Sequence, residues 1–203
     1  MPSKLNRRDL LKACGLGFAA LQIPGFKIEV LAQSAPVVEV QINSVYIRGQ
    51  WFYEPSGLFI ERGTTVRWVP TKWGATVTAF HPSNANHELR IPENAKPFDS
   101  GLIGEDSIRY NRFEWTFDVE GTYDYFSRFH EPLGLVGRIV VGRPGGPAES
   151  NRPGYGGRDG RAPIFPAQAK LLEFLSAQDI AAKKKVPYPT DLLVRTYPYS
   201  DRD

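Results

Sequence analysis

The chain has 203 residues with one Cys, one Met and three His, which is enough for one ordinary domain with extensions. A single Cys excludes an internal disulfide framework, a cysteine zinc site and a cysteine-held iron–sulfur cluster. The 19 Gly, 17 Pro and 12% aromatic residues favour a turn-rich β protein over a helical bundle.

Residues 1–32 have the parts of an export signal. The pair Arg7-Arg8 precedes an apolar stretch, residues 13–26, and a small-residue cleavage site ends at Ala32. The arrangement resembles a Tat-type signal, which predicts a periplasmic or otherwise extracytoplasmic protein. The alternative is a basic amphipathic helix of the mature protein. Because the apolar stretch is too short and too broken to span a bilayer, we expect no transmembrane segment in the mature chain.

The same segment carries the excess of positive charge. The chain has 25 Lys and Arg against 22 Asp and Glu, a formal net charge of +3. Residues 1–32 hold five basic and two acidic side chains, so the rest of the chain is balanced. A balanced chain gives no reason to expect a nucleic-acid or anionic-membrane partner. Met1 and Cys14 also lie here, so the mature chain has no sulfur-bearing side chain.

Residues 37–142 consist of short β-type runs separated by turn residues. Several short strands without helical periodicity between them predict a β-sandwich of about 100 residues. Trp68, Phe113, Trp115 and Phe117 fall in these runs, and we expect them in the core. The expected strands are 37–42, 52–55, 58–60, 65–69, 113–117, 121–126 and 137–141.

The composition changes after residue 142. Residues 143–165 are rich in Gly and Pro and are expected to form a flexible linker. Pro166 suits the first turn of a helix that reaches Lys185, followed by a polar tail to residue 203. One helix cannot bury an apolar stripe alone, so we expect it to pack on the sandwich rather than on a partner. The stripe consists of Leu171, Leu172, Leu175 and Ile180.

The most informative stretch is residues 121–137. It resembles the C-terminal copper loop of plastocyanin-like cupredoxins, Tyr-x-Tyr-x-Cys-x-x-His-x-x-x-x-Met-x-Gly. Ser127 holds the cysteine position of this pattern and Leu135 the methionine position. The positions that match without a gap are Tyr123, Tyr125, His130 and Gly137.

Two further segments carry the resemblance. The family pattern Phe-x-Pro…Ile-x-x-Gly-x-x-Val-x-Trp is met by Tyr53, Pro55, Ile60, Gly63, Val66 and Trp68, with Tyr53 replacing the Phe. Residues 98–102 match another recurring segment. The resemblance implies an all-β, cupredoxin-like Greek-key β-sandwich over residues 37–142, here with a C-terminal α-helical extension. It places the first ligand histidine at His81, or at His87, which is otherwise a solvated loop residue.

The sulfur ligands decide what chemistry remains. A type-1 copper site uses two imidazoles, a thiolate and a weak axial thioether. The hydroxyl of Ser127 is hard and un-ionised at neutral pH, and Leu135 has no donor atom, so no blue electron-transfer centre is expected. The favoured interpretation is weak, non-blue copper binding through His81 and His130, with His87 as a further candidate.

Two other interpretations stay open. One is a metal-free cupredoxin-fold module that binds or assembles with another protein, as an accessory subunit. The other makes Ser127 a nucleophile and His130 its base, although no orienting residue or oxyanion-hole motif is visible. We therefore expect no enzyme. The resemblance implies a periplasmic redox protein or a membrane complex as the partner.

Overall fold

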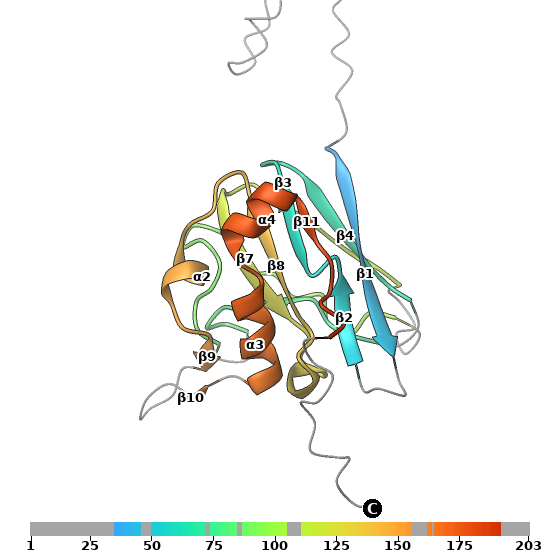
Figure 1. Cartoon of the computed structure of the whole chain (residues 1–203). Coiled ribbons are helices and arrows are strands. Elements are labelled where there is room, and N and C mark those ends of the chain that lie inside the picture. Colours follow the sequence, from blue (N-terminus) through green and yellow to red (C-terminus); the bar gives the residue numbers. More distant parts are fainter. Residues whose placement is uncertain are drawn as a thin grey trace, which may run out of the picture. The chain divides into compact units, whose positions relative to one another are not determined.

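The computed structural model shows two packed β-sheets with short helices along the outer face of one of them (Figure 1). The predicted export signal, residues 1–32, lies outside the described residues. Among the helices that the structure describes, none is long and apolar enough to cross a membrane. The structure describes residues 35–45, 50–71, 74–84, 87–104, 111–155, 162–163 and 165–191.

The first sheet has four strands in the order β2-β1-β4-β6. Strand β1 runs parallel to β4, and the other neighbours are antiparallel. Alternating apolar residues place one face of this sheet in the core, as in the inward set Val66 and Trp68. The strands are β1 (Val37–Val45), β2 (Gln50–Glu54), β4 (Thr65–Pro70) and β6 (Phe113–Thr116).

The second sheet has five strands in the order β11-β3-β8-β7-β5. Strands β7 and β8 pair antiparallel over their full length, and β3 runs parallel to β8. A separate pair is formed by β9 (Gly154–Tyr155) and β10 (Ala162–Pro163). The five strands are β3 (Gly57–Ile60), β5 (Thr78–Ala79), β7 (Gly121–Phe126), β8 (Val136–Val141) and β11 (Lys185–Val186).

The space between the two sheets, the inner core, is rich in aromatic side chains. Trp68 and Phe117 are fully buried there, and Phe113 and Trp115 pack against them while partly buried. The ring centroids of Trp68 and Tyr125 lie 5.5 Å apart in an edge-on arrangement, a favoured geometry for aromatic pairs. The predicted β-sandwich fold is thereby confirmed.

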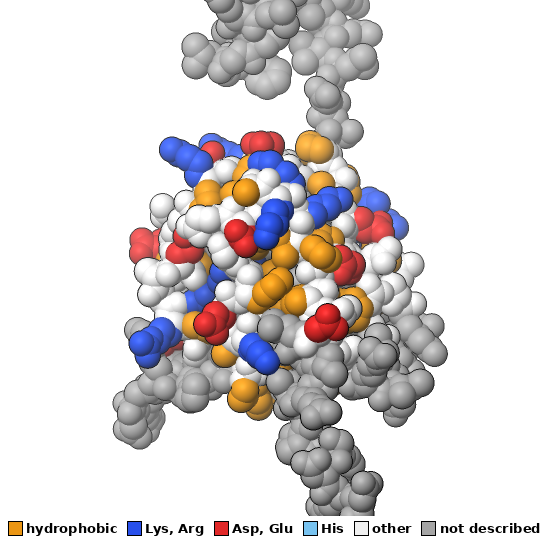
Figure 2. Space-filling view, viewed as in Figure 1, with side chains coloured by type: hydrophobic (Ala, Val, Ile, Leu, Met, Phe, Trp, Pro, Cys, Tyr) orange, Lys and Arg blue, Asp and Glu red, His pale blue; other side chains and the backbone are white. Residues whose placement is uncertain are grey.

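The outer face of the five-stranded sheet is covered by the C-terminal extension. Phe126 and Val140 of the sheet pack with Leu171 of α3 (Pro166–Phe174) and Ile180 of α4 (Ala177–Lys183), and we call this cluster the outer core. The apolar stripe therefore lies on the sandwich of its own chain. On the face shown in Figure 2, side chains of both charge signs are mixed with apolar ones.

The extension differs from the expected single helix to Lys185. Helix α3 ends before Leu175, and Ser176 begins α4 by accepting a hydrogen bond from the backbone N–H of Asp179 at 3.2 Å. An N-cap serine satisfies an otherwise unpaired helical donor, so the chain can turn here without leaving this N–H unpaired.

The described part of residues 143–165 contacts the sandwich. Short helix α2 (Pro147–Ser150) lies beside β7, and Thr122 donates a hydrogen bond to Glu149 at 2.6 Å. The side-chain amide of Asn151 donates to the carbonyl of Leu89 at 3.0 Å. The domain boundaries stay predictions, but the first half of this Gly- and Pro-rich segment is fixed by hydrogen bonds rather than free of them.

Candidate functional site

The loop that joins β7 to β8 closes on itself through backbone hydrogen bonds. The N–H of Ser127 donates to the carbonyl of Leu135 at 3.0 Å, and the N–H of Leu135 donates to that of His130 at 3.2 Å. Between them lies a single 3-10 turn, Glu131–Leu133, ended by Gly134 at a φ of 79°. A positive φ suits glycine. The loop therefore brings together the three residues that the copper-loop pattern singled out.

The hydroxyl of Ser127 is completely buried and has two partners. The backbone N–H of Thr76 donates to its Oγ at 3.1 Å, and Nδ1 of His130 lies 3.1 Å from the same oxygen. Burial lowers the pKa of His130 to about 4, so the ring is neutral at pH 7 and Nδ1 can accept the hydroxyl proton. In the tautomer with an unprotonated Nδ1, the hydroxyl donates once and accepts once. A buried hydroxyl held in this way does not present a nucleophile to a substrate.

His130 is also fixed by an aromatic neighbour. Its ring stacks on the indole of Trp51, with centroids 3.7 Å apart and planes inclined by 19°. Trp51 lies in β2, at the edge of the four-stranded sheet. The stack therefore ties the loop after β7 to the other layer of the sandwich.

His87 lies on the other side of the five-stranded sheet. Its ring contacts Phe80 and Phe126, with centroids at 4.6 and 4.1 Å, and Nε2 lies 3.4 Å from Oε1 of Glu131. Phe126 belongs to the outer core, whereas Ser127 points the opposite way. Only 1% of His87 is exposed. The expectation of a solvated loop residue is therefore wrong, because the rings of Phe80 and Phe126 cover it.

His81 lies apart from both His130 and His87. Its Nδ1 accepts from the backbone N–H of Ser83 at 3.1 Å and pairs with the Ser83 hydroxyl at 2.8 Å. Strand β5 pairs Thr78 with Phe126, and the chain then runs back along β7 toward Asp124. It moves away from Ser127 by about 3.3 Å per residue before it reaches His81.

The three histidines therefore do not meet in this structure. Within the described part of the chain, no three His, Cys, Asp or Glu side chains gather in a group that could hold a metal. The residue that faces Ser127 is instead Thr76, through its N–H, and the residue before it is the buried Ala75. The pattern analysis missed Thr76 because a backbone donor leaves no signature in the residue type.

The residues of this loop do not fit a type-1 copper ion. Such an ion needs a thiolate and two convergent imidazoles. At the thiolate position the Ser127 hydroxyl already bonds Thr76 and His130. Leu135 is fully buried in the inner core, and only one imidazole is present.

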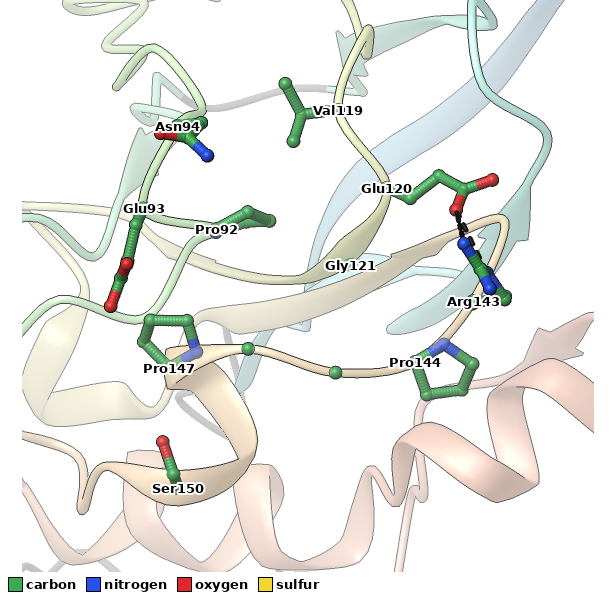
Figure 3. Close-up of a pocket in the computed structure, with 12 residues that line it drawn as sticks. Pro92, Glu93, Asn94, Val119, Glu120, Gly121, Arg143, Pro144, Pro147 and Ser150 are labelled. Atoms are coloured by element: carbon green, nitrogen blue, oxygen red, sulfur yellow. Dashed lines mark hydrogen bonds and ion pairs between the residues drawn. The ribbon is translucent and has the colours of Figure 1, made fainter.

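A hollow of about 620 Å³ lies at the opposite end of β7 (Figure 3). Its rim carries three prolines, and an ion pair joins Glu120 to Arg143 at 3.0 Å. Gly121 begins β7 here, a full strand length from Ser127. The hollow is therefore separate from the loop. The prolines are Pro92, Pro144 and Pro147.

A buried ion cluster on the outer face was not predicted from the sequence. Asp124 is completely buried between two arginines, Arg138 at 2.7 Å and Arg90 at 2.6 Å. Burial alone would raise the pKa of the Asp124 carboxyl, but the charges and hydrogen bonds of Arg138 and Arg90 outweigh it, so the pKa is lowered. Arg138 also donates to the carbonyl of Leu175, and Arg90 to that of Asn151. The cluster thus joins the sheet to Asn151, after α2, and to Leu175, after α3.

Similarity to known proteins identifies the family of this chain. No family model matches the chain. It is 27% identical over 149 residues to the chloroplastic plastocyanin of Tetradesmus obliquus, covering 69% of this chain and 92% of that protein. It is 30% identical over 95 residues to the plastocyanin of Scenedesmus fuscus, covering 46% of this chain and 89% of the relative. The chain belongs to the plastocyanin-like cupredoxin family. The crystal structure of pseudoazurin from Methylobacterium extorquens AM1 shares the cupredoxin fold at a TM-score of 0.53 and 20% identity, covering 70% of this chain and 98% of that one.

Proposed function

We propose that this cupredoxin is a metal-free binding or assembly module, an accessory subunit rather than an electron carrier. The observation that carries the proposal is the Ser127 hydroxyl, which is bonded to Thr76 and His130 at the position where the family pattern has a thiolate. With the ligand position closed by hydrogen bonds and the other two histidines elsewhere, the loop has a structural role. The sandwich then serves as a scaffold for a protein partner.

The family relationship bears on what kind of activity to expect. Plastocyanin and pseudoazurin are small electron carriers and not enzymes, and this cupredoxin is related to them. The complete burial of Ser127 also argues against acyl-transfer chemistry, because a nucleophile must reach its substrate. The protein is accordingly proposed to act by binding.

Weak copper binding through His130 is the second candidate. Burial lowers the pKa of His130 to about 4, so the imidazole is neutral at pH 7, which is the form that binds Cu(II). Its Nδ1 would have to release Ser127, and His81 or His87 would have to move to supply a second nitrogen. Such a site would be colourless and slow in electron transfer, since it has no thiolate.

Cellular location and partner are proposed from the N-terminal segment. The Arg7-Arg8 pair and the apolar stretch after it support export by a Tat-type signal to the periplasm or another extracytoplasmic space. An exported scaffold without its own redox centre suits a redox protein or a membrane complex as the partner. The matched relative from Tetradesmus obliquus is named as chloroplastic.

Metal analysis of the exported, purified protein tests the two candidates. After incubation with Cu(II) and desalting, we expect copper well below one ion per chain and no intense visible absorption. His81→Ala, His87→Ala and His130→Ala serve as matched controls. Stoichiometric copper that His130→Ala and either other variant remove would overturn the metal-free proposal in favour of the imidazole site.

A double variant tests the loop itself. Ser127→Cys with Leu135→Met restores both sulfur ligands of the family pattern. We expect no blue colour, because only His130 lies beside the new thiolate. An intense blue colour after copper addition would show that the loop keeps complete ligand geometry, which contradicts the metal-free proposal.

A further inference from the structure

A second hollow, distinct from the copper-loop position, opens over the buried ion cluster. It has a volume of about 620 Å³ and lies between the segment that contains α2 and the α3–α4 pair. Its floor includes Arg90 and Arg138, and one wall includes Leu172. We propose that this hollow binds a small organic carboxylate.

The floor offers hydrogen-bond donors that the protein does not use fully. A guanidinium has five N–H donors and no acceptor. Arg138 uses one N–H from each nitrogen on Asp124 and Leu175, and Arg90 does the same on Asp124 and Asn151. With respect to the residues that the structure describes, each guanidinium therefore keeps two donors. The side chains of Arg90 and Arg138 are only 4% and 8% exposed, so the hollow is where those donors can find an acceptor.

The charges around the hollow are balanced in sign. Asp124 supplies one negative charge for two buried guanidinium groups, and it lies fully buried with no exposed surface. The carboxylate of Glu149 on the rim raises the pKa of Arg138, although burial and Asp124 have larger effects on it. Arg152 adds a positive charge to the lining and Glu173 a negative one, so the unused N–H donors of the floor, rather than net charge, favour a carboxylate.

The apolar side chains of the lining favour a ligand with an apolar part beside its carboxylate. Besides the arginines, the lining includes the apolar side chains Ala148, Leu172 and Ala177. Pockets of this size hold small organic molecules, whose apolar part packs on apolar side chains while a few polar groups fix its orientation. A carboxylate with a short apolar body fits both features, whereas inorganic sulfate or chloride satisfies only the floor.

Glu149 lowers the affinity of this hollow for a carboxylate. Its carboxylate accepts from Thr122 at 2.6 Å and from Gln178 at 3.3 Å across the mouth. It repels a second carboxylate, so Glu149→Gln is expected to tighten binding. Arg152→Gln is expected to weaken it, because it removes a charge at the mouth. Both residues are exposed, so neither change should unfold the protein.

The experiment is calorimetric titration of the full chain with benzoate at constant ionic strength, with sodium chloride and sodium sulfate as reference anions. We expect saturable binding of one benzoate, tightened several-fold by Glu149→Gln and weakened by Arg152→Gln. Ala169→Trp should abolish binding by filling the hollow, and Ala182→Trp, on the exposed surface of α4, should leave it unchanged.

Three outcomes would overturn the proposal. These are the absence of saturable benzoate binding, equal effects of benzoate and chloride, or retention of binding in Ala169→Trp while unfolding curves show both Trp variants folded. None of these depends on copper, so the metal-free proposal for the loop stands or falls separately.

Discussion

The two faces of strand β7 solve the problem of buried polar groups in different ways. On the inner side, Ser127 directly follows the strand, and its neutral hydroxyl is satisfied by one backbone donor and one neutral imidazole. On the outer side, Asp124 is ionised and is satisfied by Arg90 and Arg138. The inner arrangement uses neutral hydrogen bonds, and the outer one uses opposite charges.

The two faces of β7 also differ in the part of the protein that surrounds them. On the inner face lies the loop that we propose to be metal-free, with Ser127 and Leu135 at the positions of the sulfur ligands in the family pattern. The outer face is covered by α3 and α4, and the charged cluster joins Leu175, after α3, to the sheet. Changes to the two faces should therefore have effects of different size and different pH dependence.

Removing the outer carboxylate should have the largest effect. Asp124→Asn leaves two buried guanidinium groups without their counter-charge, so the free energy of unfolding should fall by about 3–5 kcal/mol. Urea unfolding at pH 7 measures it. The exposed pair Arg67 and Glu114, at 2.7 Å, provides the control: Glu114→Gln should cost less than about 1 kcal/mol. Equal losses in both variants would show that the buried cluster has no special role.

The same carboxylate predicts a pH dependence. The folded pKa of Asp124 is lowered, so its contribution is complete above the unfolded value of about 4 and is lost as the pH falls through the folded pKa. Wild type should therefore lose stability below about pH 4 more steeply than Asp124→Asn does. Parallel curves for the two proteins would contradict this.

Removing the inner hydroxyl should have a smaller effect. Ser127→Ala leaves the N–H of Thr76 and Nδ1 of His130 without this partner, at a cost of about 1–3 kcal/mol. Ser127→Thr is the matched variant, since it keeps the hydroxyl and adds one methyl group. A loss from Ser127→Ala as large as that from Asp124→Asn would remove the contrast between the two faces.

A buried polar side chain of α3 takes no part in either arrangement. Gln168 is completely buried, and neither its amide nitrogen nor its amide oxygen has a hydrogen-bond partner among the described residues. Gln168→Met keeps the shape and removes the desolvation cost, so stability should rise by about 1 kcal/mol. Gln168→Glu should lower it. Thermal unfolding of the three proteins makes the comparison.

A separate effect, which depends on pH, concerns His130. Its pKa is lowered to about 4 by burial, below the unfolded value of about 6.5. The neutral ring favours the folded state at neutral pH, and this contribution is lost as the pH falls from about 6.5 to about 4. NMR titration of the ring should give a midpoint near 4. A midpoint near 6.5 would mean that the His130 ring is not buried as in this structure.

Much of the sandwich could be predicted from local patterns. The expected strand 121–126 is β7 itself, and 65–69 is β4 with one more residue. Alternation along a strand and turn residues between strands are local features, so one sequence suffices to find them. The family frame then placed Ser127, His130 and Leu135 in one loop, and the structure brings those three together.

What was missed depends on contacts between distant segments. The donor to Ser127 is the backbone of Thr76, 51 residues away, and the stacking partner of His130 is Trp51. The sequence could not show that His87 would be enclosed by Phe80 and Phe126, since spacing does not report which side of a sheet a loop reaches. The break between α3 and α4 had a local signal, Ser176 before Asp179, but it lay inside an otherwise continuous helical pattern.

The close approach of α3 to the loop places a constraint on how this protein can evolve. A Cβ atom at Gly134 would lie 2.8 Å from the Cβ of Ala167, at the start of α3, and Gly134 also has a positive φ. Neither residue can grow unless the helix shifts. Among homologues that keep the extension, positions 134 and 167 should therefore vary together, and lineages without the helix should be free to lengthen this loop.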